Sequence, residues 1–541
     1  MDSHQGEENK RIISQHIFMF PFRISPIKET INNEKPSMRE IVQSIIEGGW
    51  EYKPYKIDTC AHYSEYYYFH EYVRKAIFEL RDCYKLFEQD KATDVISCYF
   101  ERFVPNNSIV RISIKRKDKG NQIYFDYDLT IHHISLRLFS TNIGVLTIEL
   151  YNYNYPLFQD IMYINEYARR VYPQFLPDNC DIGVVKSALL ADKIEFKCGS
   201  IIDSVENFYP HTKFLNVELT VADYITELLG KPFTKEYKFI PIIDDRMFTV
   251  CWYVNADLIK KLQQKVDHTG KYKYEVSDDW YSFVFIDSSV KGVSAGGKMK
   301  EDLINRFTYS RWIHEGTLFG ITRYSLMCLT NSTFEVLRHH MERMYYQMAI
   351  ILLAQRASIL KFSDDVSKIS GKIESMTDKN EQEKFEQIAD DVKKLHSSFI
   401  HFVNRLWFTE ITPQEQGIEM YNMAVENMGL KEQLDELRLE IKELYEFVEM
   451  QYEKEKAEED RKMNKRLERL NKIAMVFLPI TVVASLFGMN LFDVDDILRF
   501  YSLVPFEFLR MGSFWQRALP FIILTIVLYS CVVLWYLRKK E

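Results

Sequence analysis

Side chains that could hold a hydrated cation recur along one stretch near the C-terminus. Residues spaced by three or four, counted back from Asn490, would share one face of a helix. Small or hydroxyl-bearing residues lie on this face near Asn490, and leucines lie mostly farther from it: Ser485, Thr481, Leu478, Ala474, Leu470, Leu467 and Asn464. Amide and carbonyl oxygens suit a hard dication that gives up its water reluctantly. Rings of leucine can close a pore by excluding water. A helix that packs against another helix with lipid on its far side would show the same spacing, so spacing alone leaves both interpretations open.

Two long apolar runs surround this stretch. Residues 473–489 are seventeen residues without a charge, and residues 518–537 are twenty. A bilayer core needs roughly 20 apolar helical residues, with about 17 at the low end. We therefore predict two transmembrane helices at the C-terminus, the first ending at 490 and the second lying in 517–541.

Basic residues predict the orientation of these helices. Lys465, Arg466, Arg469 and Lys472 precede the first run, and Arg538, Lys539 and Lys540 follow the second. Basic flanks stay in the cytoplasm. The N-terminal region and the basic tail are then cytoplasmic, and the loop 491–516 faces outward.

The triplet Gly488-Met489-Asn490 closes the first apolar run. It follows Phe477, Pro479, Ile480 and Thr481, and only one short helix comes after it. This arrangement resembles the CorA family of divalent-cation channels, over about the last 130 residues. The loop departs from the family, which often continues with a Met-Pro-Glu-Leu type of sequence, so the resemblance leaves ion selectivity open.

The resemblance implies a pentameric funnel in which the triplet forms the ion-selecting entrance, with Asn490 holding the metal ion through its water shell. It also implies that Leu467 and Leu470 form the constriction and that Asn464 lines the cytoplasmic end of the pore. Outside the triplet lie Asp493, Asp495 and Asp496. They either concentrate cations at the mouth or cap a short helix over 494–501, and both interpretations stay open.

The rest of the chain predicts a large soluble region. The formal charge of -8 gives no sign of nucleic-acid binding, and eight cysteines without CxxC pairs indicate a reducing compartment. Residues 1–10 are predicted to be a disordered tail. Residues 11–330 alternate between strand-like and helix-like segments, which predicts an enlarged α+β domain with a mixed, largely antiparallel sheet. Strands are expected at 111–115, 134–138, 146–150, 238–243, 248–254 and 280–286, with a hairpin turn at 119–121.

Long helices are predicted downstream. Residues 331–411 should form a helical hairpin, with helices at about 331–362 and 378–403. Thr412, Pro413 and Glu415 have the pattern of a capped helix start. The seam that follows steps by four and three, as in coiled coils: Leu430, Leu434, Leu437, Ile441, Leu444 and Val448. We expect one stalk helix over 412–490 that continues into the first transmembrane helix.

Ligand-binding signals upstream are weak. Arg311 and Arg323 flank a predicted strand-turn-strand element and could bind an anion, although a charged strand edge paired with carboxylates is favoured. Gly292 to Lys298 fits GxxxxGK between a predicted strand and a helix. Met299 lacks the hydroxyl that a phosphate loop uses to hold its metal, so a flexible loop is the default. The pairs His132-His133 and His339-His340 show no further ligands at metal-site spacing.

These observations favour a homo-oligomeric channel for Mg²⁺, with Co²⁺ and Ni²⁺ as further candidate ions, in a bacterial inner membrane. It would contain no catalytic residue and no resident cofactor, and ligands on its cytoplasmic domain would gate it. The chain's size, residues 309–325 and the 407–413 junction also resemble longer CorA-like proteins associated with type III CRISPR systems. That resemblance implies an alternative, an antiviral membrane effector activated by a nucleotide second messenger that joins S-adenosylmethionine and AMP. A membrane-anchored nucleotide-binding enzyme is the remote third possibility.

Overall fold

The computed structural model describes residues 11–27, 37–88, 94–118, 121–172, 190–198, 203–206, 221–266, 270–288, 293–331, 335–374 and 381–488, and a few residues between 523 and 538. It divides into two compact units, Met1–Tyr445 and Glu446–Glu541. The predicted tail at 1–10 and the predicted outer loop at 491–516 lie outside the described residues, as does most of the predicted second span.

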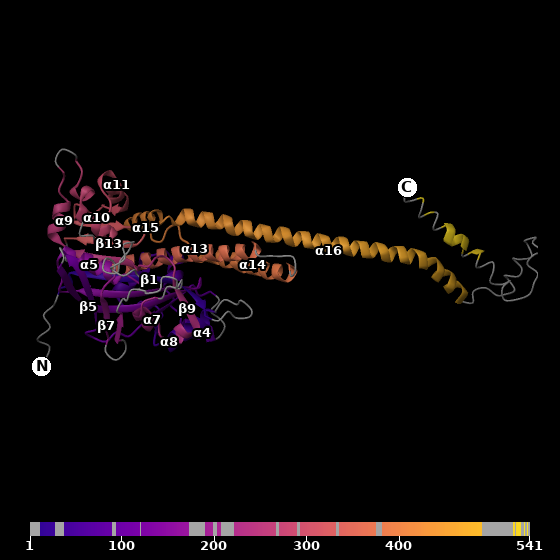
Figure 1. Cartoon of the computed structure of the whole chain (residues 1–541), viewed down its shortest axis with the longest axis horizontal. Helices are drawn as coiled ribbons and strands as arrows, with labels where there is room; N and C mark the ends of the chain where they lie inside the picture. The colour runs from indigo at the N-terminus through magenta and orange to yellow at the C-terminus, as the bar shows by residue number, and fades with distance from the viewer. Residues whose placement is uncertain are drawn as a thin grey trace, which may run out of the picture. The chain divides into compact units, whose positions relative to one another are not determined.

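One large mixed sheet forms the centre of the first unit (Figure 1). Its strands in the described residues are β1 Ser14–Pro26, β2 Glu51–Tyr52, β3 Ser97–Glu101, β4 Ile109–Asp118, β5 Asn121–Phe139, β6 Ile143–Asn152, β7 Lys193–Lys197, β8 Asp203–Glu206, β9 Tyr237–Pro241, β10 Phe248–Val254, β11 Thr308–Tyr309, β12 Thr317–Ile321 and β13 Ser325–Thr330. The main order is β11-β12-β13-β10-β1-β6-β5-β4-β7-β8. Strands β10 and β13 run parallel, whereas β1 pairs antiparallel with β6, β9 and β10. The mixed α+β fold predicted for this region is confirmed.

Local sequence patterns explain most of these strands. The predicted strands at 111–115, 134–138 and 146–150 lie within β4, β5 and β6, and those at 238–243 and 248–254 correspond to β9 and β10. Residues Asp118 and Asn121 pair across β4 and β5, which confirms the predicted hairpin. Strand β1 is buried along most of its length, because it lies in the middle of the sheet and is covered on both faces.

One predicted strand is wrong. Residues 280–286 belong to helix α10, Asp278–Phe285, and Ser277 caps it by accepting a hydrogen bond from the Trp280 amide at 3.2 Å. A serine cap followed by two aspartates is a strong helix start. Trp280, Phe283 and Val284 then face the core at helical spacing, so the aromatic run that suggests a strand is a buried helix face.

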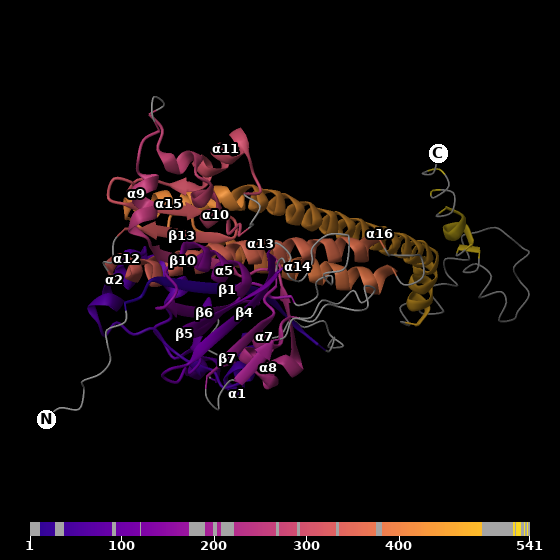
Figure 2. The same cartoon turned by 60° about the vertical axis from the view of Figure 1, so that its left-hand side comes forward.

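Further short helices cover the sheet, and α9 and α10 pack on β13 (Figure 2). The described ones are α1 Met38–Glu47, α2 Cys60–Tyr68, α3 Glu71–Ile77, α4 Cys83–Glu88, α5 Phe158–Ala168, α7 Asp223–Leu229, α8 Lys231–Glu236, α9 Ala256–Leu262, the 3₁₀ helix Lys273–Val276 and α11 Gly297–Phe307. The GxxxxGK sequence therefore leads from α10 to α11 and does not follow a strand, which removes the structural context that a phosphate loop requires.

The predicted helical hairpin is present with different bounds. Helix α12 covers Glu335–Glu342, α13 covers Met344–Glu374 and α14 covers Glu381–Arg405, and α13 contacts α14. The first half of α13 also packs on β1 and β6 and is buried almost all round, as expected of a helix enclosed by a sheet and other helices. This burial makes α13 part of the core.

The predicted single stalk helix is two helices. Helix α15 covers Glu415–Met428 and α16 covers Leu430–Gly488. Gly429 separates them in the left-handed conformation, at φ 65°, and its amide donates to the carbonyls of Val425 and Glu426. Glycine adopts this conformation without the penalty that a Cβ imposes, so it ends one helix and lets the next begin.

Thr412 does not cap α15. The N-cap is Gln414, without a side-chain capping bond. The Thr412 hydroxyl instead donates to the Tyr68 carbonyl and accepts from the Gln414 amide at 3.2 Å. This bond ties the start of α15 to the end of α2, and it uses the hydroxyl that the capping pattern needs.

Candidate functional site

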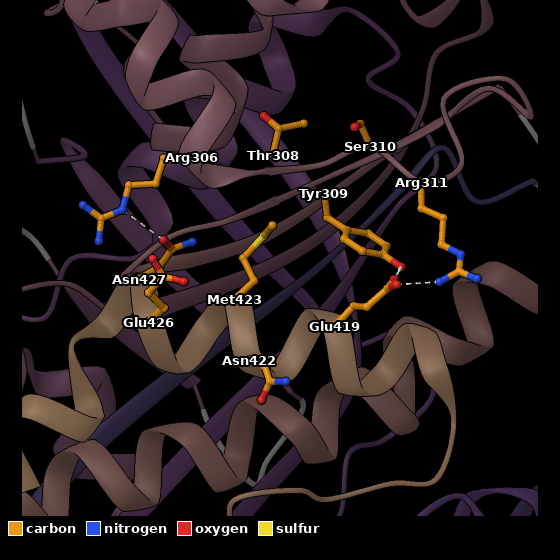
Figure 3. A pocket seen from close by; sticks show the side chains of 10 residues that line it. All are labelled: Arg306, Thr308, Tyr309, Ser310, Arg311, Glu419, Asn422, Met423, Glu426 and Asn427. Carbon is orange, nitrogen blue, oxygen red and sulfur yellow. Dashed lines mark hydrogen bonds and ion pairs between the residues drawn. The ribbon is translucent and has the colours of Figure 1, made fainter.

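Helix α15 lies between the sheet and the predicted pore helix, and an open pocket of about 680 Å³ lies beside it. The lining residues come from α11, β11, the turn after β11 and α15: Arg306, Thr308, Tyr309, Ser310, Arg311, Glu419, Asn422, Met423, Glu426 and Asn427. Figure 3 shows Tyr309 and Arg311 converging on Glu419 of α15. In this pocket, residues at the end of the sheet therefore bond to α15.

Glu419 is the central group of this pocket. Arg311 Nη1 donates to Glu419 Oε1 at 2.7 Å, and the Tyr309 hydroxyl donates to Oε2. These two donors lower the pKa of Glu419. Burial, with the nearby carboxylate, raises the pKa of Tyr309. Glu419 is therefore a carboxylate that accepts two bonds, and α15 carries a fixed negative charge facing the sheet.

A second link lies at the last-but-one residue of α15. Asn427 is buried, and its Nδ2 donates to the Ile321 carbonyl of β12 at 2.8 Å, while its Oδ1 accepts from Arg306 Nε at 3.4 Å. Asn427 therefore joins α15 to both β12 and α11. Glu419 and Asn427 together fix both ends of α15, as far as Gly429.

The three predicted ligand residues lie in different places. Arg311 is paired with Glu419, which is the arrangement expected of a charged strand edge. Arg323 is exposed and lies near the end of α15, since a Cβ at Gly429 would be 3.8 Å from its Nη2. A cation there is favoured by the partial negative charge of a helix C-terminus. Lys298 is exposed at the start of α11. Ligand binding by these residues stays a prediction.

Most of the leucine seam of α16 is buried, Leu444 is half-buried, and the residues up to Leu444 belong to the first unit. Leu430, Leu434, Leu437, Ile441 and Val448 are at most 2% exposed, and Tyr445 stacks on His396 of α14 with ring centroids 4.5 Å apart. The chain beyond Val448 is different, because every residue from 456 to 478 is exposed. Packing of the apolar seam therefore stabilises only the first part of α16.

The predicted pore-lining residues lie on this second part of α16. The helix is continuous to Gly488, so residues spaced by three and four share one face: Asn464, Leu467, Leu470, Ala474, Leu478, Thr481 and Ser485. All seven are exposed in the single chain. Thr481 Oγ1 donates to the carbonyls of Phe477 and Leu478 at 3.0 and 2.9 Å, and Ser485 Oγ donates to Thr481 O at 2.7 Å. The hydroxyl protons point back to the helix, so the oxygen lone pairs remain available to water or a cation.

The end of α16 marks the limit of the described pore region. Gly488 is the last residue of the helix. Met489, Asn490, Asp493, Asp495 and Asp496 lie outside the described residues. Within the part of the chain that the structure describes, no helix combines the length and the apolar character needed to cross a membrane.

Comparison with known proteins identifies the region that contains α15 and α16. Residues 299–539 match the family of CorA-like Mg²⁺ transporter proteins. The match includes the α15 pocket, the seam and the predicted pore face of α16, and the Gly488-Met489-Asn490 triplet. It begins in α11, well before the roughly 130 residues on which the resemblance was drawn, and residues 1–298 lie outside it. No curated protein matches the chain.

Sequence reasoning missed the partners that hold α15. Glu419 follows Arg311 by 108 residues, and Thr412 follows Tyr68 by 344, so no local pattern connects them. The break between α15 and α16, in contrast, has a local signal in the sequence. Gly429 stands directly after a helical segment, where glycine commonly ends a helix.

Proposed function

We propose that the chain forms a CorA-like membrane channel through which divalent cations, Mg²⁺ first among them, flow down their electrochemical gradient. The observation that carries this proposal is the match of residues 299–539 to the CorA-like Mg²⁺ transporter family, over a region in which one continuous helix carries all seven pore-face positions. Asn490, with Gly488 and Met489, would form the outer entrance. Passive flow needs positioned oxygens and no catalytic group.

Several copies of the chain would surround the pore, five by family resemblance. Leu467, Leu470 and Leu478 are 48%, 60% and 62% exposed in the single chain. A row of exposed leucines on one helix face calls for a covering surface, which the same face of neighbouring copies of α16 would supply around the pore axis. The arrangement also accounts for leucines on a face that carries hydroxyl groups at its other end.

The channel would lie in a bacterial inner membrane with the large α+β unit in the cytoplasm. The basic residues that flank both apolar runs support this orientation. Asp493, Asp495 and Asp496 would then face outward and raise the local concentration of cations.

Gating would act through α15. This helix is bonded to the sheet side through Glu419 and Asn427, and Gly429 joins it directly to α16. A ligand on the cytoplasmic unit changes the pore only if it binds one arrangement better than the other. The bonds at Glu419 and Asn427 provide the contacts through which such a preference would reach α16.

Ion flux through the reconstituted full chain tests the proposal. Proteoliposomes loaded with a Mg²⁺-sensitive dye should show Mg²⁺ entry, and Asn490→Ala should abolish it, because the amide that holds the ion's water is lost. Asn404→Ala, an exposed asparagine on α14, is the matched control and should leave entry unchanged. Entry that is equal in all three proteins would refute the pore assignment.

The same assay distinguishes the alternatives. Entry that requires an added nucleotide messenger, at constant Mg²⁺, would favour the defence effector. Nucleotide turnover that disappears in Lys298→Ala would favour the enzyme, although the glycine segment before this lysine follows helix α10 and not a strand, which argues against a phosphate loop.

A further inference from the structure

Three metal-ligating side chains meet in a cavity of the first unit, and two of them come from strands outside the region that matches the transporter family. His132 comes from β5, Glu149 from β6 and Glu342 from the last position of α12. One ligand atom from each residue lies within 4.8 Å of the other two, and His132 Nε2 is 3.2 Å from Glu342 Oε1. Two different strands and a helix therefore bring one imidazole and two carboxylates together.

A β-bulge aims His132 into this cavity. In the pairing of β5 with β6, Ile131 lies opposite Leu150 and His133 lies opposite Glu149, so His132 is the extra residue. Adjacent residues of a regular strand point to opposite faces. Here His132 and His133 both line the same cavity of about 580 Å³. Bulges recur beside functional sites, where they redirect a side chain.

The three ligands are held by neighbouring groups. Glu342 Oε1 accepts from the Tyr151 hydroxyl at 2.9 Å, and Oε2 accepts from Arg338 at 3.0 Å and from His339 at 3.1 Å. The Gln15 amide donates to Glu149. The His132 ring stacks on Tyr151 with centroids 4.3 Å apart. Partners of this kind orient the ligands of a metal ion and fix their geometry.

The cavity has the charge and the free acceptor that suit a cation. The side chains that line the cavity include seven carboxylates, at positions 51, 58, 65, 79, 101, 149 and 342, against four Lys and Arg side chains, at positions 53, 56, 137 and 343. Gln347, 5% exposed, also lines the cavity. Its Nε2 donates to Glu65 at 2.8 Å, and its Oε1 has no hydrogen-bond partner among the described residues. A buried acceptor of this kind calls for water or a ligand.

We propose that His132, Glu149 and Glu342 bind a Zn²⁺ ion in this cavity. One imidazole nitrogen with two carboxylates suits a borderline ion such as Zn²⁺, whereas Mg²⁺ prefers oxygen ligands and retains its waters. Three protein ligands leave a fourth position open to water, toward the cavity.

The position of the site suggests a regulatory role, which rests on the proposed channel function. Glu342 ends α12, and α13 begins two residues later and packs on β1 and β6. A bound ion would join the end of α12 to β5 and β6. Binding of a cytoplasmic transition metal would thus change how firmly the helices that precede the pore helix are held to the sheet.

Zn²⁺ binding to the purified full chain tests the site without reference to ion flux. Binding is measured by equilibrium dialysis with Mg²⁺ in large excess, so that oxygen-only sites are occupied by Mg²⁺. Co²⁺ in place of Zn²⁺ gives a visible absorption spectrum that reports the number and geometry of the bound ligands. We expect one tightly bound ion per chain in the parent protein, and at least a tenfold weaker affinity in His132→Ala and in Glu149→Gln.

His133→Ala is the matched control, because this neighbouring histidine lines the same cavity and lies outside the cluster. It should bind like the parent. Circular dichroism of each metal-free variant shows that the fold persists. If the parent binds no Zn²⁺ under these conditions, or if His132→Ala and Glu149→Gln bind like His133→Ala, then His132 and Glu342 form only an ion pair and the proposal is wrong. If the chain binds Zn²⁺ but passes no Mg²⁺, the proposed metal site stands and the proposed channel function is wrong.

Discussion

Acid should destabilise the first unit through one buried histidine. His16 lies on β1 in the middle of the sheet and is fully buried. Its Nε2 is 2.9 Å from Ser14 Oγ and its Nδ1 is 2.7 Å from Asn165 Oδ1. The Cys251 sulfur is 3.7 Å from the same Nδ1, and burial raises the pKa of that thiol to about 12, so it stays neutral. No carboxylate is among these partners.

Burial lowers the pKa of His16 from 6.5 to about 4. The unfolded chain therefore binds a proton near pH 6.5, whereas the folded chain does so only near pH 4. The stability from neutral His16 is fully present above pH 6.5 and is lost as the pH falls toward 4. At about 1.4 kcal/mol per pKa unit, the full loss is roughly 3 kcal/mol, and about 2 kcal/mol of it is lost by pH 5.

Urea unfolding of the full chain, followed by tryptophan fluorescence, measures this loss. Between about pH 7.5 and pH 5, the parent should lose about 2 kcal/mol more than His16→Gln, whatever the stability of the variant at neutral pH. His401→Gln removes an exposed histidine and should behave like the parent. Equal pH dependence in the parent and His16→Gln would show that His16 does not titrate as this packing requires.

Substitutions at three glycines test the conformation and packing of α15 and α13. In the same urea assay, Gly429→Ala should destabilise the fold by roughly 1–2 kcal/mol and Gly429→Asn by less, because alanine tolerates the left-handed conformation worse than asparagine. Equal destabilisation by the two substitutions would contradict the left-handed conformation of Gly429. Gly417→Ala should destabilise by roughly 1–3 kcal/mol, since the new Cβ would lie 2.4 Å from the Tyr68 hydroxyl and 2.5 Å from Thr412 Cγ2. Gly371→Ala, in an open helical position, should stabilise by up to about 1 kcal/mol, and a loss of stability there would contradict the open space around Gly371.

The parts of the fold that follow from local pattern could be predicted from the sequence. Alternation in 111–115 and 134–138 specifies strands because one face of each is buried, and the short turn between Asp118 and Asn121 sets their pairing. The leucine seam of α16 is visible for the same reason, since its spacing matches the helix period and its residues are buried.

The parts that depend on distant partners could not be predicted. The Thr412 pattern has the composition of a helix cap, but Tyr68 supplies a carbonyl that only the folded chain brings near. The aromatic run of α10 is compatible with a strand and with a helix, and only the capping serine before it favours the helix. His132 has no ligand nearby in sequence, because its carboxylate partners come from another strand and from α12.

Thiol accessibility along α16 tests most directly the claim that one face of this helix lines an ion path. Thr481→Cys places a thiol on the predicted pore face, and Val476→Cys places one on the opposite side of the helix. A positively charged thiol reagent should stop Mg²⁺ entry into proteoliposomes that contain Thr481→Cys. It should leave entry through Val476→Cys and through the parent chain unchanged. Equal block of both variants, or block of Val476→Cys alone, would contradict the assignment of this face to the pore.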